Sequence, residues 1–505
     1  MKVYTTLMNN IFDNIDLSKI GELLTYTPGH PLMFNSGLFM FLFLGFLIIY
    51  RAIYNMPRAR MIFVILFSLY FYYKSSGIYV LCLLLVALSD YSIGLLLNKT
   101  RNTIGRKLCV TASVLINMGM LCYFKYTAFV VDTINKFLHQ PIELWDIALP
   151  IGISFFTFRS VSYIVDIYRG KIEAERNPLN YIFFLTFFPP LVAGPVVRAS
   201  QLLPQIHNRP IVTREMFAEG VFLIMTGVFK KVVISDYISS NFVDRIFDAP
   251  ALYTGLENLL GIYGYTLQIY CDFSGYSDMA IGIALLLGYR FPINFDSPYQ
   301  SGSITEFWRR WHITLSSWLR DYLYISLGGN RVPIWRNYFN LFITMVIGGL
   351  WHGASWLFIL WGSWHGIMLV LHKAYRKLVP AQQHSGIKAQ LLHIGNVLLT
   401  FHVVAIGWVF FRAESLTTVG EMATQIFTQF HPEVFMQFVN GYPFVTLAIF
   451  VGYMLHYAPH NMATSLQNTL EHTPLVAKAF IFALFIYVVM QVRSGEVVPF
   501  IYLQF

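Results

Sequence analysis

The chain has 505 residues, of which 56% belong to the hydrophobic set AVILMFWYC and only 12% are charged, against about 25% in ordinary soluble proteins. A soluble fold cannot cover that much apolar surface, so the composition excludes a soluble enzyme, a disordered protein and a secreted disulfide-rich scaffold. The net charge of +9 lies in short loops between apolar runs, which favours a role in membrane topology and argues against nucleic-acid binding. The composition therefore predicts an all-α polytopic membrane protein.

Residues 1–30 are mixed and polar, and they are predicted to form an extracytoplasmic segment ahead of a single membrane domain over 31–505. The first apolar run begins near Pro31, too late for a signal peptide, and is interpreted as an uncleaved span. Because a span needs about 20 apolar residues, we expect about 11 transmembrane helices with additional re-entrant and interfacial pieces. The apolar runs lie near 33–50, 60–73, 77–97, 108–131, 148–167, 181–197, 217–235, 256–288, 337–372 (two spans), 391–411, 443–458 and 475–492.

Basic loops orient these spans. The loops 51–60 and 98–107 are rich in lysine and arginine, so the positive-inside rule places them in the cytoplasm and the N-terminal segment outside. The segments 168–180 and 198–214 are also basic, although one apolar run lies between them. A single crossing cannot place both in the cytoplasm.

The apolar run between those two segments contains FFPPLVAGP, residues 187–195, whose three prolines prevent a regular helix. A re-entrant hairpin explains both the prolines and the charges. Non-helical backbone at membrane depth is tolerated only inside protein or along a cavity, so this segment is expected to border an internal chamber. A kinked ordinary span is the alternative.

The segment 289–333 is the most polar long stretch between spans. Ser303 followed by Glu306 is a capping-box pattern that predicts a helix start. A basic helix with a tryptophan-rich face suits the cytoplasmic membrane interface, and a plain interfacial anchor is the simplest explanation of the tryptophans. The face that recurs at helical spacing comprises Trp308, Trp311, His312, Leu315, Trp318 and Tyr322.

Two WHG triplets lie in the run 337–372, at His352 and His365. An ionisable residue inside a membrane segment is costly and indicates function. On one continuous helix the two histidines would differ by about 220° of rotation, so they face one chamber only if the chain turns between them. His352 is preferred because Gly348, Gly349 and Gly353 surround it, whereas His365, like His372 and His402, is predicted to be structural.

Imidazole is the side chain best suited to proton transfer near neutral pH. The sequence contains no GxSxG elbow, no HExxH motif and no Walker A motif. A histidine base that activates an acceptor hydroxyl or thiol, without a covalent enzyme intermediate, is the simplest chemistry left. The four cysteines form no CxxC pair, so no metal site and no tightly bound cofactor are predicted.

Several long motifs now support a family resemblance, in the same order and over roughly residues 35–495. The chain resembles the membrane-bound O-acyltransferase family, and most of all its bacterial branch that contains the alginate O-acetylation membrane subunit. The motifs are ISFFTFRSVSYIVDIYRG (153–170), PPLVAGPVVR (189–198), DFSGYSDMAIGIALLLGYRFPINFDSPY (272–299), EFWRRWHITLSSWLRDYLYISLGGNR (306–331), GGLWHGASWLFILWGSWHG (348–366) and GWVFFRAES (407–415).

The resemblance implies that His352, in WHGASW, is the catalytic histidine and that His312, in WRRWH, is a second functional histidine. It also implies a central funnel that joins the two membrane faces, in the inner membrane of a bacterium. The donor would be a cytoplasmic thioester, either acetyl-CoA or an acyl carrier protein. A periplasmic esterase-like partner protein would complete O-acetylation of a secreted or cell-envelope polysaccharide such as alginate.

These inferences combine into one mechanistic hypothesis. His352 acts as general base on the acceptor hydroxyl, and His312 orients the site or assists proton transfer. Arginines near His312 attract the phosphates of the donor, although positive-inside topology alone would also explain them. The predicted donor-binding and polar lining residues are Arg309, Arg310, Arg331, Asp272 and Ser277.

Three alternatives remain open from the sequence. One is transfer of D-alanine from a carrier-protein thioester to teichoic acid, and another is a lipid or protein acyltransferase. The third is a transporter or flippase without chemistry of its own, against which the lack of an internal repeat weighs mildly.

Overall fold

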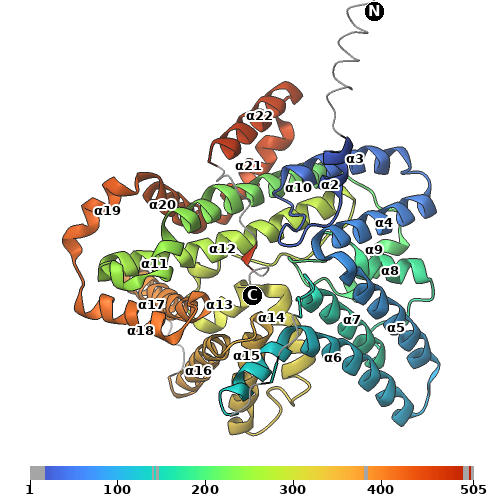
Figure 1. Cartoon of the computed structure of the whole chain (residues 1–505), viewed down its shortest axis with the longest axis horizontal. Helices are drawn as coiled ribbons and strands as arrows, with labels where there is room; N and C mark the ends of the chain where they lie inside the picture. Colours follow the sequence, from blue (N-terminus) through green and yellow to red (C-terminus); the bar gives the residue numbers. More distant parts are fainter. Residues whose placement is uncertain (1–16, 139–141, 144–146, 380–384, 493–499, 502–505) are drawn as a thin grey trace, which may run out of the picture.

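The computed structural model describes residues 17–138, 142–143, 147–379, 385–492 and 500–501, and every regular element in these ranges is helical (Figure 1). The N-terminal half begins with α2 (Leu17–Leu24), α3 (Gly37–Ala52), α4 (Pro57–Ser76), η1 (Gly77–Tyr79), α5 (Val80–Lys99), α6 (Thr103–Asn135), α7 (Ile153–Tyr168), α8 (Pro178–Thr186) and α9 (Ala199–His207). The first sixteen residues of the predicted extracytoplasmic segment lie outside the described ranges.

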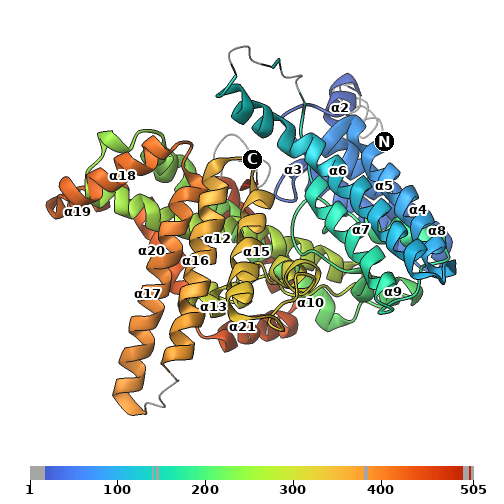
Figure 2. The ribbon, with the colours of Figure 1, turned by 90° about the horizontal axis from the view of Figure 1, so that it is seen from below.

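Helices α5, α6 and α7 pack on one another, and α8 contacts α4 and α5, so these helices form one bundle (Figure 2). α8 ends at Thr186, and residues 187–198 continue as buried, non-helical chain. This is the backbone expected from the three prolines, because each lacks an amide donor and has a fixed φ. No kinked helix runs through the FFPPLVAGP segment.

The long helix α12 (Gly255–Leu286) crosses the middle of the molecule and is buried along most of its length (Figure 1). It packs against α10 (Arg214–Val228) through facing glycines. A Cβ atom on Gly227 would lie 2.5 Å from the Gly275 carbonyl oxygen, so only glycine allows this approach. The shorter elements around α12 are η2 (Phe229–Asp236), η3 (Ser239–Val243), α11 (Asp244–Asp248), η4 (Pro250–Leu252) and η5 (Pro298–Gln300).

The C-terminal half supplies the remaining helices. α15 and α16 form an antiparallel pair, and α17 packs on α16 (Figure 2). The elements are α13 (Ile304–Arg310), α14 (Ile313–Trp318), η6 (Leu319–Tyr324), α15 (Ile334–His352), α16 (Trp356–Leu378), α17 (Gly386–Arg412), α18 (Leu416–Thr428), η7 (Pro432–Val434), α19 (Phe435–Gly441), α20 (Pro443–Tyr457), α21 (His460–His472) and α22 (Leu475–Val492).

By length and composition, three helical stretches among the described residues could each cross a membrane: Pro57–Lys99, Thr103–Asn135 and Gly386–Arg412. A fourth is the pair Pro432–Gly441 and Pro443–Tyr457, which is bent by 101°. The molecule is therefore an all-helical, polytopic membrane protein.

The predicted cytoplasmic loops meet at one end of the molecule, where side chains of one loop bind the backbone or side chains of another. We call this end the basic face. Because its bonds join segments far apart in sequence, the predicted grouping of these loops on one side agrees with the packing. The bonds run from Tyr54 to the Pro210 carbonyl (2.7 Å), from Arg106 to that of Tyr168 (2.9 Å), from Arg169 to that of Asp321 (2.8 Å), and from Arg198 to the Asp321 carboxylate (2.7 Å).

The prediction of one continuous interfacial helix after Ser303 is wrong. Ser303 does cap α13, since its hydroxyl accepts from the Glu306 amide at 3.2 Å. The helix breaks at His312, however, where φ is +42°, and a separate helix, α14, begins at Ile313. The tryptophans also face inward: Trp311 and Trp318 are buried in the protein core rather than at a membrane surface.

Candidate active site

The chain reverses between His352 and His365. α15 ends at His352, and α16 begins four residues later at Trp356. The two histidines therefore lie on antiparallel helices, and both rings contact Trp361, at centroid distances of 4.9 and 5.0 Å. The chain therefore turns between His352 and His365, as is required for the two histidines to face one region. His365 is fully buried among aromatic rings and packs against Gly407 of α17.

Glycines make the reversal possible. A Cβ atom on Gly349 would lie 2.3 Å from the Phe358 carbonyl oxygen, and one on Gly353 would lie 2.0 Å from the Phe358 ring. Only a hydrogen fits at either position. The glycine-rich surroundings of His352 therefore serve close helix packing.

The end of α15 is held by α6. The last carbonyls of a helix have no partner within the helix. Here the Lys125 ammonium donates to the carbonyls of Trp351 (2.5 Å) and His352 (3.0 Å), and the Tyr126 hydroxyl donates to that of Leu350 (2.9 Å). These bonds fix the backbone that carries His352.

The side chain of His352 is buried in an aromatic wall formed by Trp351, Trp361 and Phe411, with centroid distances of 4.9, 4.9 and 5.4 Å. Trp351 also contacts His312, at 6.1 Å. The structure thus brings the two predicted catalytic histidines to the same indole ring, from elements about 40 residues apart in sequence.

His312 is fully buried and sits in a polar network. Its Nδ1 lies 3.0 Å from Asn294 Oδ1, and the Asn294 side-chain amide donates to the Ser277 hydroxyl at 3.1 Å. The predicted lining residue Ser277 therefore lies behind His312, with Asn294 between them. The Phe273 ring packs edge-on against the imidazole at 4.5 Å.

Asp272 lies next to Phe273 on α12. Its carboxylate pairs with the buried Lys231 ammonium at 2.7 Å and accepts from the Ile501 backbone amide at 2.8 Å. It is thus engaged in a buried ion pair and in holding the C-terminal segment, whose Phe500 ring packs on Phe273 at 5.5 Å.

The proline-containing segment touches the same network. The Val196 amide donates to the Thr314 hydroxyl at 2.9 Å, and Thr314 in turn binds Asn294. The segment that was expected to border an internal chamber therefore contacts the His312 network directly.

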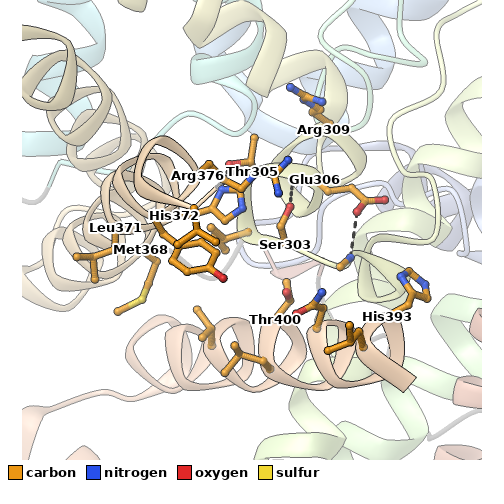
Figure 3. A pocket seen from close by; sticks show the side chains of 18 of the residues that line it. Ser303, Thr305, Glu306, Arg309, Met368, Leu371, His372, Arg376, His393 and Thr400 are labelled. Atoms are coloured by element: carbon orange, nitrogen blue, oxygen red, sulfur yellow. Dashed lines mark hydrogen bonds between the residues drawn. The ribbon is translucent and has the colours of Figure 1, made fainter. Parts of the chain in front are cut away.

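The three predicted donor-binding arginines lie in different surroundings. Arg309 lines a cavity of about 1140 Å³ between α13, α16 and α17, which Figure 3 shows from close by. Arg310 pairs with Glu306 at 2.9 Å, and Arg331 is exposed in the loop before α15.

The cavity has polar and apolar walls. Arg376 of α16 joins Arg309 there, and the hydroxyl of Thr305 lies 2.8 Å from Nδ1 of His372 (Figure 3). Neither arginine has an ion-pair partner among the residues that the structure describes. The apolar wall is formed by Met368, Leu371, Leu392, Leu399 and Val403.

Sequence reasoning missed two residues that hold the histidines. Lys125 is a lysine inside the predicted span 108–131, which is itself a signal of function in a membrane segment. Asn294 carried no such signal, because its partners at 277, 312 and 314 are brought together only by the fold.

Comparison with known proteins shows the family to which the chain belongs. A model of the membrane-bound O-acyltransferase family matches residues 153–412, which include both histidines. The chain belongs to the membrane-bound O-acyltransferase family, and it is an acyltransferase.

Three relatives carry different printed names. A probable alginate O-acetylase AlgI of Pseudomonas aeruginosa is 42% identical over 406 residues, which are 79% of this chain and 75% of that protein. A peptidoglycan O-acetyltransferase of Helicobacter pylori is 37% identical over 415 residues, or 76% of this chain and 78% of that protein. A teichoic acid D-alanyltransferase of Bacillus subtilis is 28% identical over 408 residues, or 75% and 98%.

Proposed function

We propose that this protein is a membrane O-acetyltransferase that passes an acetyl group from a cytoplasmic thioester across the bacterial inner membrane. The group is destined for a secreted or cell-envelope polysaccharide such as alginate. The observation that carries the proposal is the pair of buried histidines at the Trp351 ring, in a chain similar to proteins named for O-acetylation. The lower identity to the D-alanyltransferase favours acetyl over D-alanyl as the group transferred.

In the proposed reaction His352 accepts the proton of an acceptor hydroxyl as its oxygen attacks the thioester carbonyl. The carbon–sulfur bond of the donor breaks, and the leaving thiolate takes up a proton, so an ester and a free thiol result. His312, which also contacts the Trp351 ring, orients the reactants or assists proton transfer.

The donor, acetyl-CoA or an acyl carrier protein, enters from the basic face. Its phosphates bind near Arg309, with Arg310 and Arg331 adding to the positive potential on that side. Arg376, which lines the same cavity as Arg309, supports this location. Ser277 supports the site through Asn294, and Asp272 supports it through its neighbour Phe273, whose ring packs on His312.

About 11 membrane crossings surround a central funnel in this proposal, with His352 and His312 inside it. A periplasmic esterase-like partner protein takes the acetyl group at the far side and delivers it to the glycan. No tightly bound cofactor and no metal take part, since two imidazoles suffice for the proton transfers.

The test is acetylation in a bacterial host that lacks its own polysaccharide O-acetylating membrane protein. The wild-type chain, supplied with its periplasmic partner, is expected to restore base-labile acetate on the exopolysaccharide, and His352→Ala to abolish it at equal membrane level. The matched control is His402→Gln, because His402 is exposed on α17 and bonds the Tyr263 hydroxyl at 2.9 Å. Normal acetylation by a well-expressed His352→Ala variant would rule the assignment out.

A second measurement separates an enzyme from a transporter. The purified protein in lipid nanodiscs is given acetyl-CoA together with the periplasmic partner protein as acetyl acceptor, and release of free thiol is followed. The proposal expects thiol release that depends on His352, whereas a transporter without chemistry would release none.

A further inference from the structure

We propose that Asn294 is a positioning residue that holds His312 as its Nδ1–H tautomer. Nε2 is then the proton-accepting atom that His312 presents to the site. The importance of this tautomer for acyl transfer rests on the proposed function, but the tautomer itself follows from the hydrogen bonds.

The orientation of the Asn294 side chain is fixed by Thr314. The backbone amide of Thr314 lies 3.3 Å from Asn294 Oδ1, and an N–H group can only donate. The Thr314 hydroxyl accepts from the Val196 amide, so its own hydrogen is available to Asn294 Oδ1 at 2.8 Å. A flipped side chain would turn its NH₂ group toward two donors.

The other end of the amide agrees with this orientation. Asn294 Nδ2 donates to the Ser277 hydroxyl at 3.1 Å, and both side chains are buried. Oδ1 therefore faces His312, where it can only accept. Nδ1 of His312, 3.0 Å away, must carry the hydrogen.

A neutral imidazole has one N–H group, so the lone pair resides on Nε2. Nε2 is buried and has no hydrogen-bond partner among the residues that the structure describes. The His312 ring is packed against Phe273 and Trp351, and Trp351 also contacts His352. The lone pair of Nε2 is therefore available to accept a hydrogen bond or a proton from a group that enters the site.

The backbone of Asn294 also fixes where the ring lies. The Asn294 carbonyl accepts from the Ile313 amide at 2.9 Å, and the Asp296 amide donates to the Arg310 carbonyl at 3.0 Å. These two bonds flank His312, whose φ of +42° turns the chain between α13 and α14. The segment 294–296 thus holds the backbone at His312, and the Asn294 side chain sets the protonated nitrogen of the imidazole.

The experiment is nitrogen NMR of the full chain in nanodiscs with ¹⁵N-labelled histidine. The signals of His312 are assigned by their loss in His312→Asn. At a pH where the ring is neutral, the wild type is expected to show a protonated Nδ1 and an unprotonated Nε2. A wild-type signal with the proton on Nε2 would overturn the proposal without any variant.

Two substitutions sharpen the result. Asn294→Ala is expected to lose the tautomer preference and to lower kcat for thiol release at least about ten-fold, with KM for acetyl-CoA nearly unchanged. Asn294→Asp keeps an acceptor beside Nδ1 and is expected to keep the tautomer and more activity than Asn294→Ala. An unchanged His312 tautomer in a folded Asn294→Ala variant would also contradict the proposal.

The matched control is Asn340→Ala, which removes another buried side-chain amide, one that donates to the Leu327 carbonyl at 2.9 Å. It is expected to leave the His312 tautomer unchanged. If His312→Asn keeps full transfer activity, the role of His312 in the proposed function fails, whereas the tautomer measurement still stands or falls by itself.

Discussion

At the scale of single residues, the site depends on glycines, which have no side chain, as well as on its histidines. Gly349, Gly353 and Gly362 lie where α15 and α16 meet, and a Cβ atom at any of them would come within 2.5 Å of the facing helix. The approach of the two helices sets where His352 lies. Replacing one of these glycines with a larger residue should therefore destabilise the α15–α16 hairpin.

Gly349→Ala is expected to lower the stability of the protein by about 1–3 kcal/mol, because the added methyl group overfills a tight helix contact. Gly119→Ala is the matched control, since Gly119 is an exposed helical glycine with no atom of another segment within 4 Å of the added Cβ. That control should be neutral or slightly stabilising. Thermal unfolding in detergent measures both, and equal melting temperatures would contradict the packing argument.

Two local features of the sequence predict the site histidines: His352 is an ionisable residue in an apolar run, and His312 lies in the WRRWH motif of the family resemblance. The sequence was not sufficient to find Asn294. Its role depends on contacts with positions 277, 312 and 314, which are 17 to 20 residues away. No periodic pattern in the sequence indicates that these positions come together.

At the scale of elements, α6 acts as a support for α15. Its Lys125 and Tyr126 side chains satisfy three carbonyl groups at the end of the helix that bears His352. The favourable charge for a helix C-terminus is positive, so the ammonium also complements the helix dipole. The position of the His352 imidazole is thus determined by a helix more than 200 residues earlier in the chain.

Lys125→Met is expected to reduce kcat for thiol release about ten-fold or more, since a free helix end lets the imidazole move away from its working position. KM for acetyl-CoA should change little. Thr127→Ala is the control on the same helix, because the hydrogen bond of the Thr127 hydroxyl within the described ranges goes to the Tyr123 carbonyl of α6 itself, at 2.7 Å. Equal turnover of the wild type and Lys125→Met would show that α6 does not position His352.

Element boundaries were predictable wherever hydrophobicity alone decides them, as for α4, α5, α12 and α17. The break at His312 was not, because Trp308, Trp311, Leu315 and Trp318 keep a helical spacing across it. What interrupts the helix is pairing with the backbone of residues 294–296, which is a tertiary interaction.

At the scale of the whole molecule, the two ends differ in construction. At the basic face, side chains of one loop bind the backbone of loops far away in the sequence. Helices α18 and α19 lie elsewhere, at the end of α17 that is opposite its junction with α16 (Figure 2). If the basic loops lie in the cytoplasm, as the positive-inside rule predicts, α18 and α19 are expected on the opposite side of the membrane.

Cysteine labelling tests that orientation. In a background without the four native cysteines, Gln429→Cys, between α18 and α19, should react with a membrane-impermeant maleimide in spheroplasts of a bacterial host. Arg101→Cys, at the basic face, should react only after the membrane is permeabilised. The reverse pattern would mean that the protein is inserted the other way round.

The bonds of the basic face also affect its susceptibility to proteases. Trypsin must draw an extended stretch of chain into its cleft and enclose a free arginine side chain. The guanidinium groups of Arg106, Arg169 and Arg198 are instead held by carbonyl or carboxylate oxygens of other loops. Cleavage at these arginines requires local opening of the face, so this surface is expected to be cut first at exposed arginines that make no such bond in the described part of the chain, such as Arg101.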